Sequence, residues 1–326
     1  MTMRTQRRAL LLGALATPAL ATGARAAWPE RSIRIVIPYP PGGASDTTAR
    51  LITEPLTRAL GQNVVVDNRP GANGAIALEN VATSPNDGHT LLMGNLGPNA
   101  INPVMRANLP FDAVRSFAPI VLANKVPMAL MVRADHPARD FARLVAMARE
   151  APGRIGYGSA GNGSASHLAG EMLKVTLGID LLHVPYRGDA PAITDVLSGA
   201  LPCMLSTTVS VLPQMRSGRM RVLGVASAQR LSSMPDVPTF LEQGVAGYEV
   251  SSWNGLFAPA GTPRPVIERV NAEASQALRI PEVTQRLEML GAASAMGTPE
   301  EFATFLRAEL DRWAEVVRVS GAKAED

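Results

Sequence analysis

The stretch Pro38-Tyr-Pro-Pro-Gly-Gly-Ala-Ser-Asp46 stands between a short apolar run and a helical pattern. Upstream, Ile33 to Ile37 is rich in β-branched residues and predicts a strand. Downstream, apolar residues recur at helical spacing until Gly61, which stands where a helix C-cap would. The stretch therefore leads from the carboxyl end of a strand into a helix, and in open α/β sheets that edge is where ligands bind.

The N–H groups at the start of this helix lack partners within the helix, so they predict an anionic ligand, above all a carboxylate. Gly42 and Gly43 would let the backbone approach it closely. The alternative is a stiff Pro-Gly turn that only connects two elements. Asp46 also has two interpretations: it accepts N–H bonds and holds the loop in shape, or it receives an ammonium or hydroxyl group of the ligand.

Residues 1–26 predict a signal peptide. A basic start with Arg7-Arg8 precedes the apolar run Ala9 to Leu15, and Ala24-Arg25-Ala26 fits a cleavage site. The apolar run is too short to span a bilayer, so we expect an exported, periplasmic protein rather than an anchored one. The paired arginines leave open whether export is secretory or twin-arginine.

Removing this segment takes away four arginines and no acidic residues, so the formal net charge of +3 becomes −1. Nothing electrostatic then points to nucleic acid as a partner. The one cysteine, Cys203, lies in an apolar context and is expected to be a buried strand residue. The four histidines show no metal-ligand spacing, and we expect neither a metal nor a cofactor.

Strand-like and helix-like patterns alternate along the mature chain, which predicts an α/β fold with parallel strands and helices on both faces. About 300 residues suit two lobes better than one core. Val126 to Val132 is expected to cross into the second lobe, and Tyr248 to Ser252 to return from it. The expected boundaries are residues 27–126 with 249–326 for lobe 1 and residues 127–248 for lobe 2.

A capping box predicts the start of the last helix. Thr298 stands at the N-cap, Pro299 follows at the first position, and Glu301 completes the box. The apolar stripe beyond it is expected to cover lobe 1.

The second lobe contains a loop of the same kind as the first, placed between a strand and a helix. A strand over Arg154 to Tyr157 is followed by Gly158-Ser-Ala-Gly-Asn-Gly-Ser-Ala-Ser-His167 and then by a helix. Two such loops facing each other across a cleft would hold a small anion from both sides. At the edge of the first lobe, Asn95 and Asn99 follow the third strand and either contact the ligand or cap and turn the chain.

Two enzyme interpretations compete for this second loop. Gly156-x-Gly158-x-x-Gly161, with Asp180 further on, satisfies a dinucleotide fingerprint, although Asn162-Gly163-Ser164 delays the helix. Neither Ser159 nor Ser164 stands in the Gly-x-Ser-x-Gly pattern of hydrolases. His167 lies one turn after Ser164, an arrangement that suits a helix cap better than a nucleophile and its base.

Taken together, the motifs resemble the substrate-binding receptors of tripartite tricarboxylate transporters, the Bug-type periplasmic receptors. The resemblance covers nearly the whole mature chain and rests on six segments in this order: Tyr39–Gly43 with Asp46, Asn68–Ala72, Tyr157–Ser164 with His167–Gly170, Val184–Gly188, Pro235–Thr239 and Ala258–Pro263.

The resemblance implies a type II periplasmic-binding-protein fold, with two α/β lobes, two crossover strands and a ligand cleft between the lobes. It implies that both loops hold a ligand carboxylate through N–H groups, hydroxyls and bridging water. The ligand-binding residues that we predict are Tyr39, Pro41, Gly42, Gly43, Asp46, Asn95, Ser159, Gly161, Asn162, Gly163, Ser164, His167, Tyr186 and Ser206.

We therefore expect a monomeric, non-catalytic receptor for a small organic carboxylate (a dicarboxylate, tricarboxylate, amino acid or aromatic acid) that delivers it to the membrane subunits of a transporter. A sensor that binds the same solutes, and an exported enzyme, are the alternatives. One departure concerns the ligand. Family members often carry an aspartate after the strand that here reads Cys203-Met-Leu-Ser-Thr-Thr208, and this chain has hydroxyls instead. If that position faces the far end of the ligand, we expect the preference there to shift from an amine or hydroxyl toward a less basic group.

Overall fold

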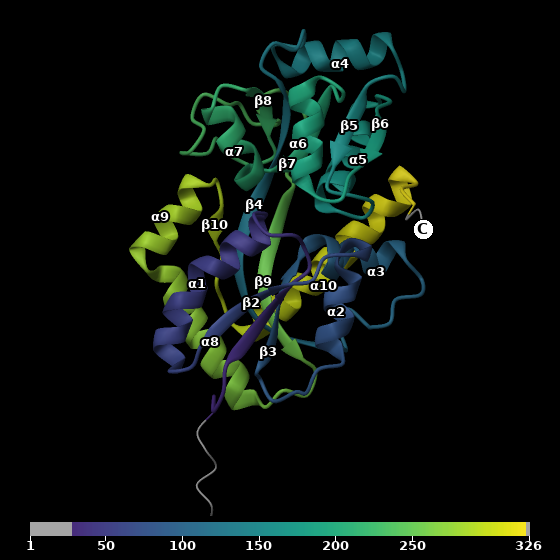
Figure 1. Ribbon diagram of the computed structural model, residues 1–326. Coiled ribbons are helices and arrows are strands. Elements are labelled where there is room, and N and C mark those ends of the chain that lie inside the picture. The colour runs from purple at the N-terminus through teal and green to yellow at the C-terminus, as the bar shows by residue number, and fades with distance from the viewer. Residues whose placement is uncertain (1–27, 324–326) are drawn as a thin grey trace, which may run out of the picture.

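The computed structural model describes residues 28–323, so the predicted signal peptide lies outside the described residues. Figure 1 shows two α/β lobes, one above the other, joined by long strands that run between them. The predicted fold class is confirmed: the chain has two α/β lobes joined by two crossover strands.

In the lower lobe of Figure 1, three parallel strands lie beside an antiparallel one, in the order β2-β1-β3-β9, and β4 pairs with the far edge of β9. The chain enters this lobe first and returns to it at the end. Its elements are β1 (Ile33–Ile37), α1 (Ala44–Leu60), β2 (Val64–Asn68), η1 (Ala72–Gly74), α2 (Ala75–Ala82), β3 (Thr90–Asn95), η2 (Gly97–Ile101), α3 (Asn102–Met105), β9 (Ser251–Pro259), α8 (Arg264–Arg279), α9 (Pro281–Met289), β10 (Ala293–Ser294) and α10 (Pro299–Ser320).

In the upper lobe, the second half of β4 lies between β8 and β7, and β5 and β6 continue the sheet beyond β7. Helices α4 to α7 surround this sheet in Figure 1. The elements are β4 (Phe117–Arg133), α4 (Phe141–Glu150), β5 (Gly156–Ser159), α5 (Ala165–Leu177), β6 (Leu182–Pro185), α6 (Asp189–Ser198), β7 (Cys203–Thr207), α7 (Thr208–Arg216) and β8 (Met220–Val225).

Strand β4 serves both sheets. Residues 117–127 pair with β9 in the lower sheet, whereas residues 128–133 pair with β7 and β8 in the upper one. The predicted crossover at Val126 to Val132 is therefore the second half of a longer strand. The predicted return strand was misplaced: Tyr248 to Ser252 reaches only the start of β9. Gly255 lies inside β9 because the ring of Phe302 fills the space where a side chain would project.

The predicted capping box at the start of α10 is confirmed. The Thr298 hydroxyl accepts from the Glu301 N–H at 3.2 Å, and the Glu301 carboxylate accepts from the Thr298 N–H at 2.8 Å. Phe302, Leu306 and Trp313 of the apolar stripe are buried. The helix lies against β4, η2 and α3 but also against α5 of the upper lobe. It therefore bridges the lobes rather than covering the lower one alone.

No helix within residues 28–323 is both long and apolar enough to cross a bilayer. Cys203 is a free, buried thiol in β7, as the sequence predicts.

Candidate functional site

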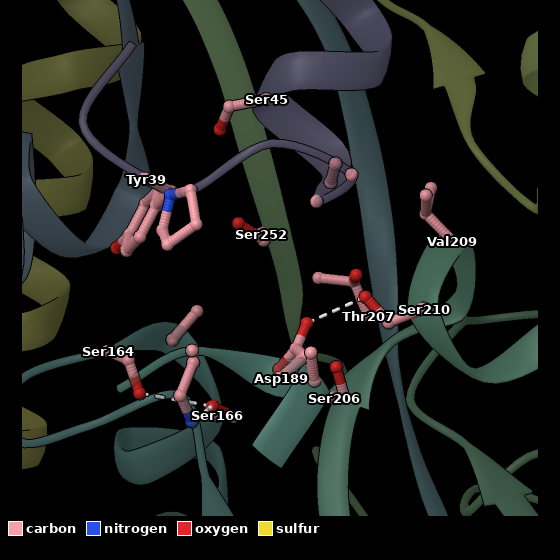
Figure 2. Close-up of a pocket in the computed structure, with 18 of the residues that line it drawn as sticks. Tyr39, Ser45, Ser164, Ser166, Asp189, Ser206, Thr207, Val209, Ser210 and Ser252 are labelled. Carbon is pink, nitrogen blue, oxygen red and sulfur yellow. Dashed lines mark hydrogen bonds between the residues drawn. The ribbon is translucent and has the colours of Figure 1, made fainter. Parts of the chain in front are cut away.

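A cavity of about 340 Å³ lies between the two lobes. Its wall contains the first residues of four helices: α1 from the lower lobe and α5, α6 and α7 from the upper one. Each helix follows a strand end, which is why the four N-termini meet at the inner edges of the two sheets. Figure 2 shows the side chains that surround this space, with Tyr39 and Ser45 on one side and Ser164, Asp189 and Ser206 on the other.

Three of these helices start without a side-chain cap. The N-cap residues are Gly43 for α1, Gly188 for α6 and Thr207 for α7, and none of them accepts a bond from its own helix. Helix α5 differs, because the Ser164 hydroxyl accepts from the His167 N–H at 3.2 Å. The uncapped N–H groups and the positive ends of the helix dipoles favour an anion in the cavity.

Two buried hydroxyls in the cavity wall lack partners. Ser206 is 1% exposed, and neither its Oγ nor the Oγ1 of Thr207 has a hydrogen-bond partner among the described residues. A buried polar atom without a partner is destabilising unless a ligand or water satisfies it. These hydroxyls are therefore suited to hold a polar group of a bound solute.

Other hydroxyls of the wall are already engaged. Ser45 donates to Oδ1 of Asn254 at 2.6 Å, and Ser252 accepts from Nδ2 of Asn95 at 3.0 Å. Oγ of Ser166 accepts from the Ala160 N–H at 2.9 Å. These bonds fix the wall in position before any ligand arrives.

Tyr39 lies near the start of the first loop and lines the cavity. Its hydroxyl donates to Oδ1 of Asn73 at 3.2 Å. Burial, with the nearby Asp189 carboxylate, raises the pKa of Tyr39 well above its usual range. The phenol therefore stays neutral and remains a hydrogen-bond donor.

Half of the predicted ligand-binding residues line this cavity. They come from the first loop, the end of β3, the start of α5 and the end of β7: Tyr39, Pro41, Gly42, Gly43, Asn95, Ser164 and Ser206. The other half lie outside the lining, and the physical reason differs from one to the next.

Asp46 points back into its own loop. It is 4% exposed, and Oδ2 accepts from the Gly42 N–H at 3.0 Å and from Nε of Arg50 at 2.9 Å. Oδ1 accepts from Nδ2 of Asn68 at 3.1 Å. These contacts match the loop-holding interpretation of Asp46.

Ser159 and Tyr186 bond to other parts of the upper lobe. Oγ of Ser159 lies 2.6 Å from Nε2 of His183, and Ser159 is fully buried. The Tyr186 hydroxyl donates to Oδ2 of Asp195 at 2.7 Å. Although serine and histidine are close here, the buried serine has no path to a solute in the cavity.

Three residues of the turn before α5, numbers 161–163, contact other parts of the protein instead of lining the cavity. A side chain at Gly163 would run into Oδ1 of Asn102 and Nδ2 of Asn73, and Gly161 packs under the Tyr186 carbonyl. Asn162 also lies outside the lining. Nδ1 of His167 accepts from the Gly163 N–H at 3.1 Å, so that His167 shapes the turn.

Asn99 likewise serves the chain itself, since its Oδ1 accepts from the Asn95 N–H at 3.0 Å. Among the described residues, no cluster of three or more histidine, cysteine, aspartate or glutamate side chains could hold a metal ion.

The sequence interpretation missed Asp189, Thr207, Ser210 and Ser252. Asp189 is the first residue of α6, and it was missed because Gly188 before it offers no capping side chain that would mark the helix start in the sequence. Ser252 was missed because the strand over it was placed too early in the chain.

Comparison with known proteins identifies the same family that the sequence motifs resemble. Residues 48–321 match the tripartite tricarboxylate transporter family receptor, TctC. A protein encoded in the tcbD–tcbE intergenic region of a Pseudomonas strain is 42% identical over 95% of this chain and 94% of its own length. BugT of Bordetella pertussis is 33% identical, with 91% of each chain covered.

Solved structures agree. MatC of Rhodopseudomonas palustris, with bound malate, is 33% identical with a TM-score of 0.84, and the match covers 89% of this chain and all of MatC. A second R. palustris protein, solved with adipate, is 33% identical with a TM-score of 0.88, covering 91% of this chain and 99% of the other.

Proposed function

Since the chain belongs to the tripartite tricarboxylate transporter receptor family, whose members are solute-binding proteins and not enzymes, we propose that it captures a small organic carboxylate and delivers it to the membrane subunits of such a transporter. A periplasmic location follows from the family. Export by a secretory or twin-arginine signal and a monomeric receptor are parts of the same proposal. So are the lobe boundaries, residues 27–126 with 249–326 and residues 127–248.

The observation that carries the proposal is the meeting of four helix N-termini at one cavity. Micromolar binding needs about 8 kcal/mol. A hydrogen bond to a charged group contributes about 1.5 to 3 kcal/mol net, so four or five N–H and hydroxyl donors are enough after the ligand has been ordered. Related proteins solved with malate and adipate support a carboxylate as the ligand.

The proposal is tested by calorimetric titration of the purified receptor with mono-, di- and tricarboxylates, amino acids and aromatic acids. We expect one molecule bound per chain and no change in the solute after long incubation. Accumulation of a product would overturn the receptor assignment.

A sensor that binds the same solutes remains the competing function. Deleting the gene separates the two: a transport receptor is needed for uptake of the radiolabelled solute, whereas a sensor is needed only for the transcriptional response to it. Unchanged uptake in the deletion strain would refute delivery to a transporter.

A further inference from the structure

The cavity wall contains a carboxylate in a place where a carboxylate ligand is expected. Of the described residues that line the cavity, Asp189 is the only acid and Arg187 the only base. Figure 2 shows the Asp189 side chain beside Ser206, Thr207 and Ser210. Like charges repel strongly in a poorly hydrated site, so Asp189 disfavours any ligand with a carboxylate at both ends.

Asp189 does not have the usual role of an acid in a first helical turn. Helix α6 has no side-chain cap, and the Asp189 carboxylate accepts no N–H bond from its own helix. One oxygen, Oδ2, accepts from Oγ of Ser210 at 2.6 Å. Oδ2 alone accepts a hydrogen bond of good geometry from the described residues. The Ser206 hydroxyl lies near the carboxylate but outside that geometry, so Oδ1 can still accept from a ligand.

The neighbours of Oδ1 fit a particular chemical group. The unpartnered hydroxyls of Ser206 and Thr207 lie on the same side of the cavity. An ammonium group has three N–H donors and no acceptor. One carboxylate oxygen and two hydroxyl oxygens would satisfy all three donors, and the carboxylate would balance the charge.

The electrostatics point the same way. Burial raises the pKa of Asp189, although the neighbouring hydroxyls of Ser210 and Ser206 oppose the shift. Burial thus destabilises the charged carboxylate of Asp189 when no cation is nearby. A ligand ammonium would offset this destabilisation. Arg187 is exposed to solvent, which screens its charge, and it forms no ion pair with Asp189.

We propose that Asp189 receives a protonated amine, so that the receptor selects carboxylates with an amino group at the far end over dicarboxylates of equal length. The ligand carboxylate lies against the uncapped start of α1 in the lower lobe, and the amine lies against Asp189 in the upper lobe. This inference rests on the proposed function, since it assigns the solute class of the same cavity.

The test compares matched ligands by calorimetry: γ-aminobutyrate with glutarate, δ-aminovalerate with adipate, and valerate as the uncharged-tail reference. The parent protein should bind the better amino acid at least about tenfold more tightly than its diacid partner. Asp189→Asn should weaken amino-acid binding about ten- to a hundredfold and leave diacid binding unchanged or tighter.

Asp195→Asn is the matched control. Asp195 lies on the same helix outside the cavity and bonds to the Tyr186 hydroxyl, so its replacement makes the same charge change without touching the ligand. The preference for amino acids should persist in this variant. Circular dichroism of both variants checks that they are folded.

The outcomes are distinct. If the parent binds diacids more tightly than amino acids, and Arg187→Ala abolishes that binding, the amine assignment is wrong while the receptor function stands. Equal weakening of both ligand classes by Asp189→Asn would also overturn the inference. If no carboxylate binds to any folded form, the proposed function itself fails.

Discussion

The indole Nε1 of Trp253 donates a hydrogen bond of 3.0 Å to Oε2 of Glu309, and this bond joins β9 to α10. Nε1 of Trp313 donates to the same oxygen at 3.1 Å. Glu309 is 7% exposed. Because α10 also lies against α5 of the upper lobe, the helix that carries this buried carboxylate contacts both lobes.

Glu309→Ala is therefore expected to leave two buried indole N–H groups without an acceptor. Each such loss costs about 1 to 3 kcal/mol, so the free energy of unfolding should fall by about 2 to 6 kcal/mol in urea denaturation. Glu309→Gln retains an acceptor and should lose about 1 kcal/mol. If both variants lost the same free energy of unfolding, the hydrogen-bond acceptor at position 309 would not be the source of the stability.

Asp46→Asn should weaken the first loop rather than change ligand preference. Burial alone would raise the pKa of Asp46, but bonds from Arg50, Gly42 and Asn68 outweigh it and lower the pKa below its usual value. Its stabilising contribution is thus present above about pH 4 and is lost as the pH falls. At neutral pH we expect a loss of about 1 kcal/mol and equal, small losses of affinity for plain and amino-substituted carboxylates.

The control is Glu54→Gln, which removes an exposed ion pair with Arg58 on the same helix and should change stability by less than about 0.5 kcal/mol. A selective loss of amino-substituted ligands in Asp46→Asn would show instead that Asp46 contacts the ligand.

Ser206→Ala and Thr207→Val should each reduce the affinity for the cognate solute about tenfold to a hundredfold. Their melting temperatures without ligand should not fall, because neither hydroxyl has a protein partner to lose. Thr176→Val, on the exposed side of α5, serves as the control for removing a hydroxyl. If the two variants were less stable than the parent but bound the solute equally well, both hydroxyls would stabilise the fold and not contact the ligand.

Stability should fall in mild acid because of two stacked histidines. The rings of His167 and His183 lie 3.9 Å apart. Burial, aided by the charge of Lys174, lowers the pKa of His167 to about 4, and burial, aided by His167, lowers that of His183 to about 3. An unfolded histidine titrates near pH 6.5, so below this value the unfolded chain binds protons that the folded chain does not.

Each histidine then contributes a slope of up to about 1.4 kcal/mol per pH unit between about pH 6.5 and about pH 4. Urea unfolding at several pH values measures it. His183→Gln should reduce the slope, and an identical slope in this variant would refute the assignment.

Ligand binding should close the lobes. Two strands, β4 and β9, connect the sheets, and we expect the bending to concentrate in residues 126–132 and 250–257. Small-angle X-ray scattering should show a smaller radius of gyration with saturating solute. Superposable curves with and without solute would contradict a closing motion.

Local chemistry was sufficient to predict much of this molecule. The strand before Pro38, the helix that ends at Gly61 and the cap at Thr298 each follow from signals within a few residues. The first loop could be predicted as part of the site because a strand end followed by a helix start defines its position in an α/β sheet.

Other features depend on contacts far apart in the chain. Ser159 bonds to His183, and the interval between them carries no signal that would pair them. Gly255 lies within β9, and the ring of Phe302 from a distant helix occupies the space beside it, a contact that no local pattern predicts. Asp46 allows two interpretations from the sequence, and the bonds that it accepts from Gly42, Arg50 and Asn68 favour the loop-holding one.

Strand β9 fills the place between β3 and β4, although about 150 residues separate it from β3 in the chain. During synthesis, β3 thus presents an unpaired edge until residue 259 is available. Such an edge can pair with other chains and start aggregation. Truncations that end before β9 should therefore be insoluble, because the first sheet to begin folding is complete only when the last quarter of the chain is available.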